Sequence, residues 1–179
     1  MSPHRFAPLA LLLLAPFAQA ACPEGSTLTL RSDNDVYGQA GQDQGYSAGF
    51  AAGWATPTVG RGETGCLAPI DRATRWLAWG PGEHRNLVLT YHHAIYTPTD
   101  GTRADLITDD RPYAGTMLFG VGQQVRDGER LAATHLRLGI VGPSAQGEAA
   151  QDAFHHLFGR DRFRGWDNQL KDEPLLQLL

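Results

Sequence analysis

Apolar and polar positions alternate along the chain from Ser26 to Val141. Such alternation predicts strands whose two faces meet different surroundings. The pattern predicts about six strands of roughly ten residues, a length typical of transmembrane barrels, whereas soluble sandwiches show the same alternation in shorter strands. They are expected at Ser26–Arg31, Ser47–Thr56, Asn86–Tyr96, Ala114–Arg126 and Arg130–Val141, with a sixth beginning near Pro174. The predicted fold is all-β, an antiparallel up-and-down transmembrane β-barrel.

The alternation breaks at Gly147–Gly159. Apolar residues here have the spacing of one helix face: Ala150, Phe154, Leu157 and Phe158. Polar residues fall on the other face: Glu148, Gln151, Asp152 and His155. The pattern predicts one short helix in a loop, carrying a histidine with carboxylate and amide neighbours.

The connections between the predicted strands separate two sets of residues. In an up-and-down arrangement, connections 33–46, 97–113 and 142–173 share one end of the barrel. The N-terminus and connections 57–83 and 127–129 share the other, which puts Cys22 and Cys66 at the same end. The candidate reactive residues fall at the opposite end.

The first twenty residues are predicted to be a secretory signal peptide. Arg5 precedes the apolar run Ala7–Phe17, and Ala18-Gln19-Ala20 is a small-residue cleavage pattern. The mature chain is then 21–179, and it is exported. No later apolar run is long enough for a helical span, so any membrane crossing must be made by strands.

Composition narrows the function classes. Without Arg5, the mature chain has 14 basic and 19 acidic residues, and no basic stripe, so nucleic-acid binding is not expected. Cys22 and Cys66 are the only cysteines, and an even pair in an exported chain indicates a disulfide, with two free thiols as the alternative.

Leu179 falls inside the sixth predicted strand. An open set of strands leaves unpaired backbone groups in lipid, at a cost of several kcal/mol each. We therefore expect the barrel to be closed by another copy, by another chain, or by a missing C-terminal half.

Two short motifs and one histidine are candidates for chemistry. Gly45–Gly49 matches the G-x-S-x-G pattern around Ser47, but a strand follows the serine where a nucleophile elbow needs a helix. Asp33-Asn34-Asp35 closes the first strand and offers oxygen ligands suited to Ca²⁺, or else an Asx-type turn. An imidazole such as that of His155 can take a proton from water, although an ordinary loop histidine fits the pattern as well.

Asp109-Asp110-Arg111-Pro112-Tyr113 ends the third connection. Asp110 and Arg111 are expected to form a structural ion pair.

Taken in order, the motifs resemble those of the outer-membrane lipid A 3′-O-deacylase (LpxR) family. The matching pieces are Asp33-Asn34-Asp35, Gly45–Gly49, Tyr96-Thr97-Pro98, Asp110–Gly115, Gly139–Pro143, Gly147-Glu148 with Gln151, His155 and Gly159, and Gly165-Trp166 with Gln169. The resemblance runs from about Leu28 to the end of the chain.

This resemblance implies a twelve-stranded barrel, of which the chain holds the N-terminal half, with a site at the outer rim beneath the loop helix. It implies Ca²⁺-dependent hydrolysis in which His155 activates water and Asn34 and Asp35 lie at the metal. Ser47 matches a family hydroxyl. Arg103 stands where one branch has lysine, and it keeps a positive charge for a lipid phosphate.

The function expected on these grounds is hydrolysis of the 3′-linked acyloxyacyl ester of lipid A, the anchor of lipopolysaccharide, at the cell outer membrane. The alternative is a truncated, non-catalytic barrel or surface-binding fragment. A soluble lipocalin-like barrel is disfavoured, because the large loops gather at one end.

Overall fold

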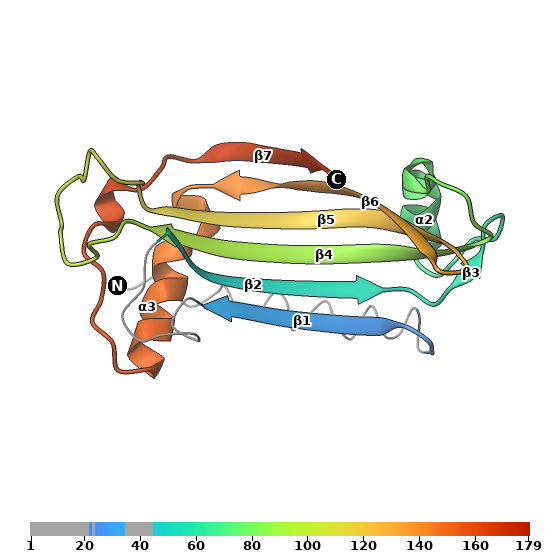
Figure 1. Cartoon of the computed structure of the whole chain (residues 1–179), viewed down its shortest axis with the longest axis horizontal. Helices are drawn as coiled ribbons and strands as arrows, with labels where there is room; N and C mark the ends of the chain where they lie inside the picture. The colour runs from blue at the N-terminus through green and yellow to red at the C-terminus, as the bar shows by residue number, and fades with distance from the viewer. Residues whose placement is uncertain (1–21, 23, 35–44) are drawn as a thin grey trace.

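The computed structural model describes Cys22, residues 24–34 and residues 45–179; the predicted signal peptide lies outside them. Figure 1 shows one antiparallel sheet with a helical segment near each end. The strands are β1 (Thr27–Asn34), β2 (Gly45–Ala55), β3 (Val59–Gly60), β4 (His84–Thr97), β5 (Ala114–Asp127), β6 (Arg130–Val141) and β7 (Glu173–Leu178). The helical segments are α2 (Ala68–Thr74), η2 (Arg75–Leu77), η3 (Pro143–Ala145), α3 (Gly147–Leu157) and η4 (Trp166–Asn168).

The sheet is a meander. The long strands pair antiparallel in the order β1-β2-β4-β5-β6-β7, and the short β3 pairs with β4. Within the described residues the sheet is open, with β1 and β7 at its edges. The predicted all-β, up-and-down arrangement is confirmed, and so is the loop helix, which ends at Leu157 rather than at Gly159.

One face of the sheet carries continuous apolar rows. Residues paired across neighbouring strands share a face. One row is Leu28, Trp54, Leu89, Val121, Leu136 and Leu178, and the next is Leu30, Ala52, Tyr91, Phe119, Leu138 and Leu176. Many of these side chains are exposed, among them Leu28 and Leu138. An outward apolar band of this kind is the lipid-facing surface of a membrane barrel.

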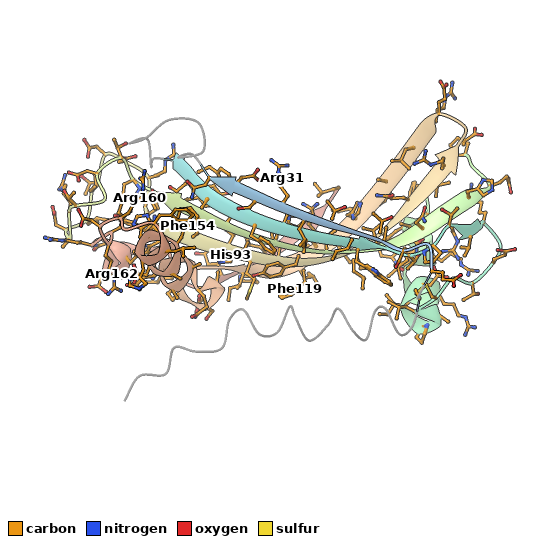
Figure 2. All side chains as sticks on the ribbon, turned by 90° about the horizontal axis from the view of Figure 1, so that it is seen from below. Arg31, His93, Phe119, Phe154, Arg160 and Arg162 are labelled. Carbon is orange, nitrogen blue, oxygen red and sulfur yellow. A yellow bond between two sulfur atoms is a disulfide. The ribbon has the colours of Figure 1, made fainter. Side chains whose placement is uncertain are left out.

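The opposite face is polar and small. The row between the two apolar ones is Thr29, Gly53, Thr90, Gly120, Arg137 and Gln177. In Figure 2 the sheet is bowed, with Arg31 on its concave side and Phe119 on its convex side. We call the two surfaces the concave face and the convex face. The pairing register therefore places polar groups where the inside of a barrel would lie.

The helices α2 and α3 both pack on the convex face, at opposite ends of the strands (Figure 2). At one end, the buried Arg85 on β4 binds Asp71 of α2. At the other, His93 Nε2 donates to the carbonyl oxygen of Ala145, just before α3, at 2.8 Å. As predicted, connections 98–113 and 142–172 lie at the α3 end of the strands, and connections 61–83 and 128–129 lie at the α2 end; residues 35–44 of the first connection lie outside the described residues.

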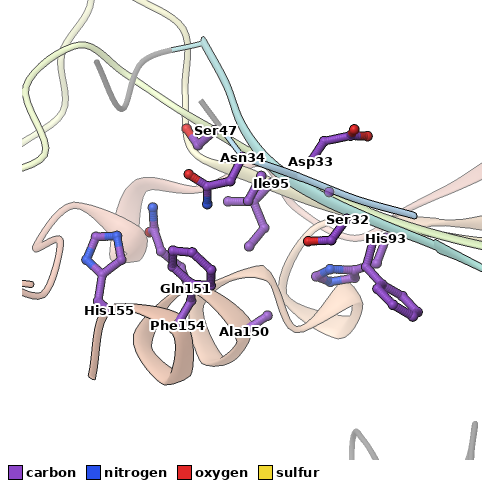
Figure 3. A pocket seen from close by; sticks show the side chains of 13 residues that line it. Ser32, Asp33, Asn34, Ser47, His93, Ile95, Ala150, Gln151, Phe154 and His155 are labelled. Carbon is purple, nitrogen blue, oxygen red and sulfur yellow. The ribbon is translucent and has the colours of Figure 1, made fainter. Parts of the chain in front are cut away.

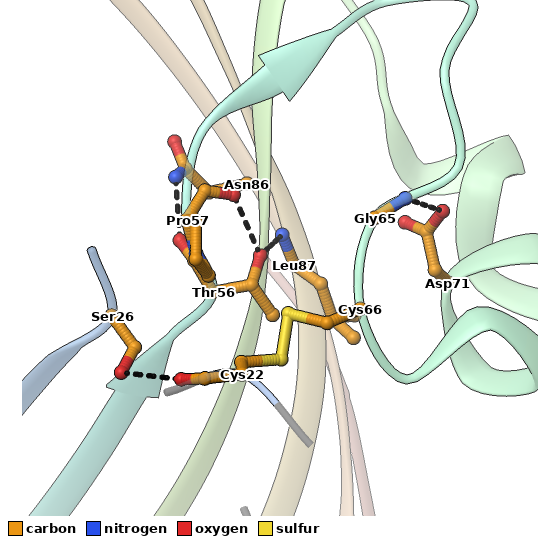
Figure 4. Close-up of a disulfide and its surroundings, with 9 residues drawn as sticks. All are labelled: Cys22, Ser26, Thr56, Pro57, Gly65, Cys66, Asp71, Asn86 and Leu87. Atoms are coloured by element: carbon orange, nitrogen blue, oxygen red, sulfur yellow. Dashed lines mark hydrogen bonds between the residues drawn. A yellow bond between two sulfur atoms is a disulfide. The ribbon is translucent and has the colours of Figure 1, made fainter. Parts of the chain in front are cut away.

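The predicted disulfide between Cys22 and Cys66 is present, with the two Cα atoms 5.8 Å apart (Figure 4). It joins the chain before β1 to the connection that carries α2.

Among the described residues, no helix has both the length and the apolar character needed to cross a membrane.

Candidate functional site

Helix α3 lies close to the sheet because glycines face each other where it begins. A Cβ on Gly147 would lie 2.8 Å from the Cα of Gly115 on β5, which is closer than real Cβ contacts. Gln146, immediately before the helix, has a left-handed φ of 60° and turns the chain from η3 into α3. The pair of glycines thus lets the helix backbone rest directly on the strand.

The second turn of α3 is fixed by a buried hydrogen bond. Trp166 Nε1 donates to Gln151 Oε1 at 2.8 Å, and both side chains are buried. The Trp166 ring packs against Tyr113 with the ring centroids 4.9 Å apart and the planes tilted by 48°. These rings form a small core with Ile95 of β4, so the helix is held at a defined distance from the sheet.

His155 lies one turn further along α3 and is only 4% exposed. Its Nδ1 is 2.6 Å from the carbonyl oxygen of Asp161. A carbonyl can only accept, so Nδ1 carries the proton and Nε2 is the basic nitrogen. The ring also meets Phe163 edge-on, with centroids 5.0 Å apart. The orientation and the tautomer of His155 are therefore both set by the loop that follows the helix.

A second set of contacts ties this loop to the helix. Arg162 binds Glu148 and Asp152, each at 2.7 Å. Burial raises the pKa of Asp152, repulsion from Glu148 adds to this, and the attraction of Arg162 opposes it. The ion pairs lie on the outer side of the helix, and Arg162 is largely exposed.

A cavity of about 140 Å³ lies between α3 and the convex face. Its polar lining comes from three strands and the helix: Ser32, Asn34, Ser47, His93, Gln151 and His155. Its apolar lining includes Phe50, Ile95, Ala150 and Phe154. Figure 3 shows the Asn34 side chain directed into the space near Gln151 and His155.

The structure brings three of the predicted site residues together. Asn34, Ser47 and His155, which are distant in sequence, line the same cavity. Asp35 lies outside the described residues. The carboxylate of Asp33 lies on the other side of β1, where it accepts from Arg31 Nε at 2.8 Å, so it does not line the cavity through its side chain.

Ser47 occupies a β-bulge in β2, not a nucleophile elbow. The register of β2 against β4 shifts between Tyr46 and Ala48, and β2 continues to Ala55 with no helix after the serine. The bulge turns Ser47 onto the convex face, where its Oγ lies 2.6 Å from Thr97 Oγ1 and both residues are buried.

Arg103 is not among the residues that line the cavity. It lies in the 98–113 connection, half-exposed, in an ion pair with Asp105. That guanidinium lowers the pKa of Asp105 through a hydrogen bond.

Among the described residues, the expected close ion pair between Asp110 and Arg111 is not found, and the Arg111 charge lowers the pKa of Asp110 less than the hydrogen bonds from Thr99 and the Arg111 amide do. Asp110 accepts instead from the backbone amides of Thr99 and Arg111, each at 2.7 Å. The Thr99 amide is close because the connection folds back on itself here, whereas the Arg111 amide belongs to the next residue.

His93 is a lining residue that the sequence reasoning did not single out. A signal was present, because His93 is a polar residue at an apolar position of the alternation, opposite Phe50 and Met117. Ser32 and Phe154 were also not proposed as site residues.

The cavity offers amide and hydroxyl oxygens, but no cluster of three or more His, Cys, Asp or Glu side chains occurs among the described residues. Oxygen atoms of Asn34, Ser32 and Ser47 are the hard donors that Ca²⁺ prefers, and a full set would need further oxygens. Two imidazoles also line the cavity, but His93 Nε2 and His155 Nδ1 each bind a backbone carbonyl oxygen, so the oxygen donors fit Ca²⁺ best.

The family model described as outer membrane protein LpxR matches residues 6–179. The solved structure of LpxR from Salmonella typhimurium is similar, with a TM-score of 0.60 at 17% sequence identity. The match covers 86% of this chain and 51% of that one, so the chain spans about half the length of the solved relative. A search of curated protein sequences gave no significant match.

Proposed function

Because the chain belongs to the LpxR family of outer membrane proteins, we propose that it hydrolyses the 3′-linked acyloxyacyl ester of lipid A in a Ca²⁺-dependent reaction. The observation that carries the proposal is the cavity under α3. It gathers Asn34, Ser47 and His155 at one end of the strands, on the face that also carries the apolar band.

The position of the cavity suits a lipid ester. Phe50 lines the cavity and also begins an aromatic series along the convex face, with Tyr91 at 6.3 Å and Phe119 at 5.1 Å from Tyr91. A lipid lying against this surface would keep its acyl chain on apolar side chains while its ester reaches the polar lining. The lipid would reach the cavity along the convex face, without crossing the sheet.

His155 is the proposed general base. With Nδ1 donating to the Asp161 carbonyl, Nε2 is the nitrogen that accepts a proton from water as the water attacks the ester carbonyl. The hydrogen bond to Asp161 keeps the ring oriented when the imidazole becomes charged. Ser47 is not used as a nucleophile, and its hydroxyl, held by Thr97, supports the substrate end of the cavity.

Asn34 and, from the family resemblance, Asp35 are the proposed Ca²⁺ ligands. Bound Ca²⁺ would polarise the ester carbonyl and stabilise negative charge on its oxygen. The antiparallel pairing of β1 with β2 places Asn34 opposite Ala48, so a paired strand and not a loop carries the Asn34 amide. Arg103 is proposed to attract a lipid phosphate.

Mass spectrometry of lipid A from cells that express the chain tests the proposal, with and without a Ca²⁺ chelator. We expect loss of the 3′ acyloxyacyl mass only when Ca²⁺ is present. Unchanged lipid A, with the protein folded in the outer membrane, would contradict the proposal and favour the non-catalytic or surface-binding alternative.

A further inference from the structure

The connection between β3 and β4 carries an amphipathic segment, Ala68–Trp79, that the proposed reaction does not use. Its inward residues are Asp71, Thr74 and Leu77, and all three are buried. Its outward residues are Ile70, Trp76 and Trp79, which are 40%, 58% and 67% exposed. Two tryptophans this exposed on one short segment mark a surface for interaction, because Trp normally buries much of its large apolar area.

The segment is held rigidly on the convex face. Arg85 Nη2 binds Asp71 Oδ2 at 2.8 Å, and Gln123 Nε2 donates to Thr74 Oγ1 at 3.1 Å. Arg85 and Gln123 are buried and come from β4 and β5. Burial raises the pKa of Asp71, but hydrogen bonds from Arg85 and Gln123 outweigh it and bring the pKa to about 2. Asp71 is therefore ionised and paired at neutral pH.

Further hydrogen bonds and a disulfide hold the two ends of the segment. Arg61 Nη1 donates to the carbonyl oxygens of Gly80 and Gly82, at 2.8 and 3.1 Å. The Cys22–Cys66 disulfide lies just before α2, and Asp71 also accepts from the amide of Gly65 at 3.2 Å (Figure 4). The exposed tryptophans are thus presented by a pinned segment.

The register shows what lies next to this segment. Gln123 pairs with Leu87 on the convex face, and the next pair along that face is Val121 with Leu89, within the first apolar row. The segment therefore packs on the convex face directly next to the first apolar row, with Ile70, Trp76 and Trp79 exposed on its outward side. It lies at the end of the strands that also has the short Asp127–Arg130 turn, and short turns are found on the periplasmic side of outer-membrane barrels.

We propose that Trp76 and Trp79 insert into the phospholipid leaflet on the periplasmic side of the outer membrane, at the level of the headgroups and the upper acyl chains. Indole rings prefer this depth, because their apolar body enters lipid while the N–H stays near water. The segment anchors the end of the sheet opposite the cavity. This inference rests on outer-membrane location and not on any catalytic activity.

Tryptophan fluorescence in phospholipid vesicles tests the anchor. The folded chain is compared with Trp76→Phe/Trp79→Phe, and the difference between their spectra isolates the two anchor tryptophans. Quenching is measured with lipids brominated near the headgroup, with lipids brominated near the chain end, and with aqueous iodide. Trp54→Phe is the matched control, because Trp54 lies on the same face but within the apolar row.

We expect the anchor signal to be quenched most by bromine near the headgroup and least by iodide, while the signal of Trp54 responds more to the deeper bromine. Strong iodide quenching of the anchor signal, with no response to either brominated lipid, would overturn the proposal. Because phenylalanine replaces two exposed rings, the double variant is expected to fold. If it does not, single replacements isolate each tryptophan in turn. Loss of deacylation with a normal anchor signal would affect only the proposed function.

Discussion

The two ends of the sheet differ in what lies beneath the helix that covers them. At each end, a short helical segment rests on the convex face. Under α2, the space is filled by the buried Arg85 and Asp71 with Gln123, and a disulfide lies close by. Under α3, the helix is held at Gln151, while the space around His155 stays open as a cavity of about 140 Å³.

The difference suggests different roles for the two ends: contacts at the α2 end stabilise the fold, and the cavity at the α3 end is the candidate binding site. At the α2 end, buried charges neutralise each other, which is the condition under which they are tolerated. At the α3 end, polar groups from three strands and a helix point into shared space, which suits binding of a polar ligand or an ester. The four substitutions below test this contrast.

The largest expected effect is on activity, for His155→Ala. Loss of the proposed general base should lower the proposed deacylation rate by about 10²- to 10⁴-fold. His156→Ala is the matched control, because His156 is the next residue and is exposed, and it should change the rate by no more than about twofold. The measurement is the rate of 3′ acyl release from lipid A. Equal losses in the two variants would contradict a special role for His155.

Asp71→Asn should mainly affect stability. It leaves the Arg85 charge buried without its partner, and such losses cost about 3–5 kcal/mol. Urea unfolding in detergent, followed by circular dichroism, measures this cost. Asp105→Asn is the control, because its ion pair with Arg103 is exposed and should contribute at most about 1 kcal/mol. Similar losses in both variants would contradict the contrast.

Because Asp71 is paired with Arg85, we expect the stability of the fold to fall in acid. The pKa of Asp71 in the folded protein is about 2, below its ordinary 3.8, so this carboxylate adds stability above about pH 4. That contribution is lost as the pH falls towards 2. The Asp71→Asn variant should lack this part of the acid transition, and an unchanged transition would show that other groups cause it.

Cys66→Ser should cost less than Asp71→Asn but still lower stability, by about 2–4 kcal/mol. The bond closes a loop with a sequence separation of 44 residues, which restricts the unfolded chain. The shift in the urea midpoint under oxidising conditions measures the loss. A reducing agent should lower the midpoint of the unmodified protein and leave that of the variant unchanged. A midpoint that does not respond to reduction would contradict this prediction.

The smallest effect is expected for Gln151→Ala, at about 1–3 kcal/mol, because the indole N–H of Trp166 is then left buried without an acceptor. A double-mutant cycle with Trp166→Phe checks the cause. The double variant should lose less than the sum of the single variants, because both partners are then gone. Additive losses would show that the hydrogen bond does not hold α3.

The strands and the loop helix could be predicted because their signals are local. Alternation with a period of two located β4, β5 and β6 within a few residues, and the spacing of Ala150, Phe154 and Leu157 located α3. The ordered motifs also indicated Asn34, Ser47 and His155 as site residues. The segment α2 was less visible, because seven residues with a proline give little helical periodicity.

What the sequence alone determined was the alternation, and therefore which residues share a face and which end of the strands each connection occupies. Only the tertiary structure decided that both helices lie on the apolar face and that Arg85 meets Asp71. It also decided that a bulge at Ser47 turns this hydroxyl towards Thr97. These features depend on contacts between segments far apart in the chain, where side-chain shape and the pairing of buried charges select the arrangement.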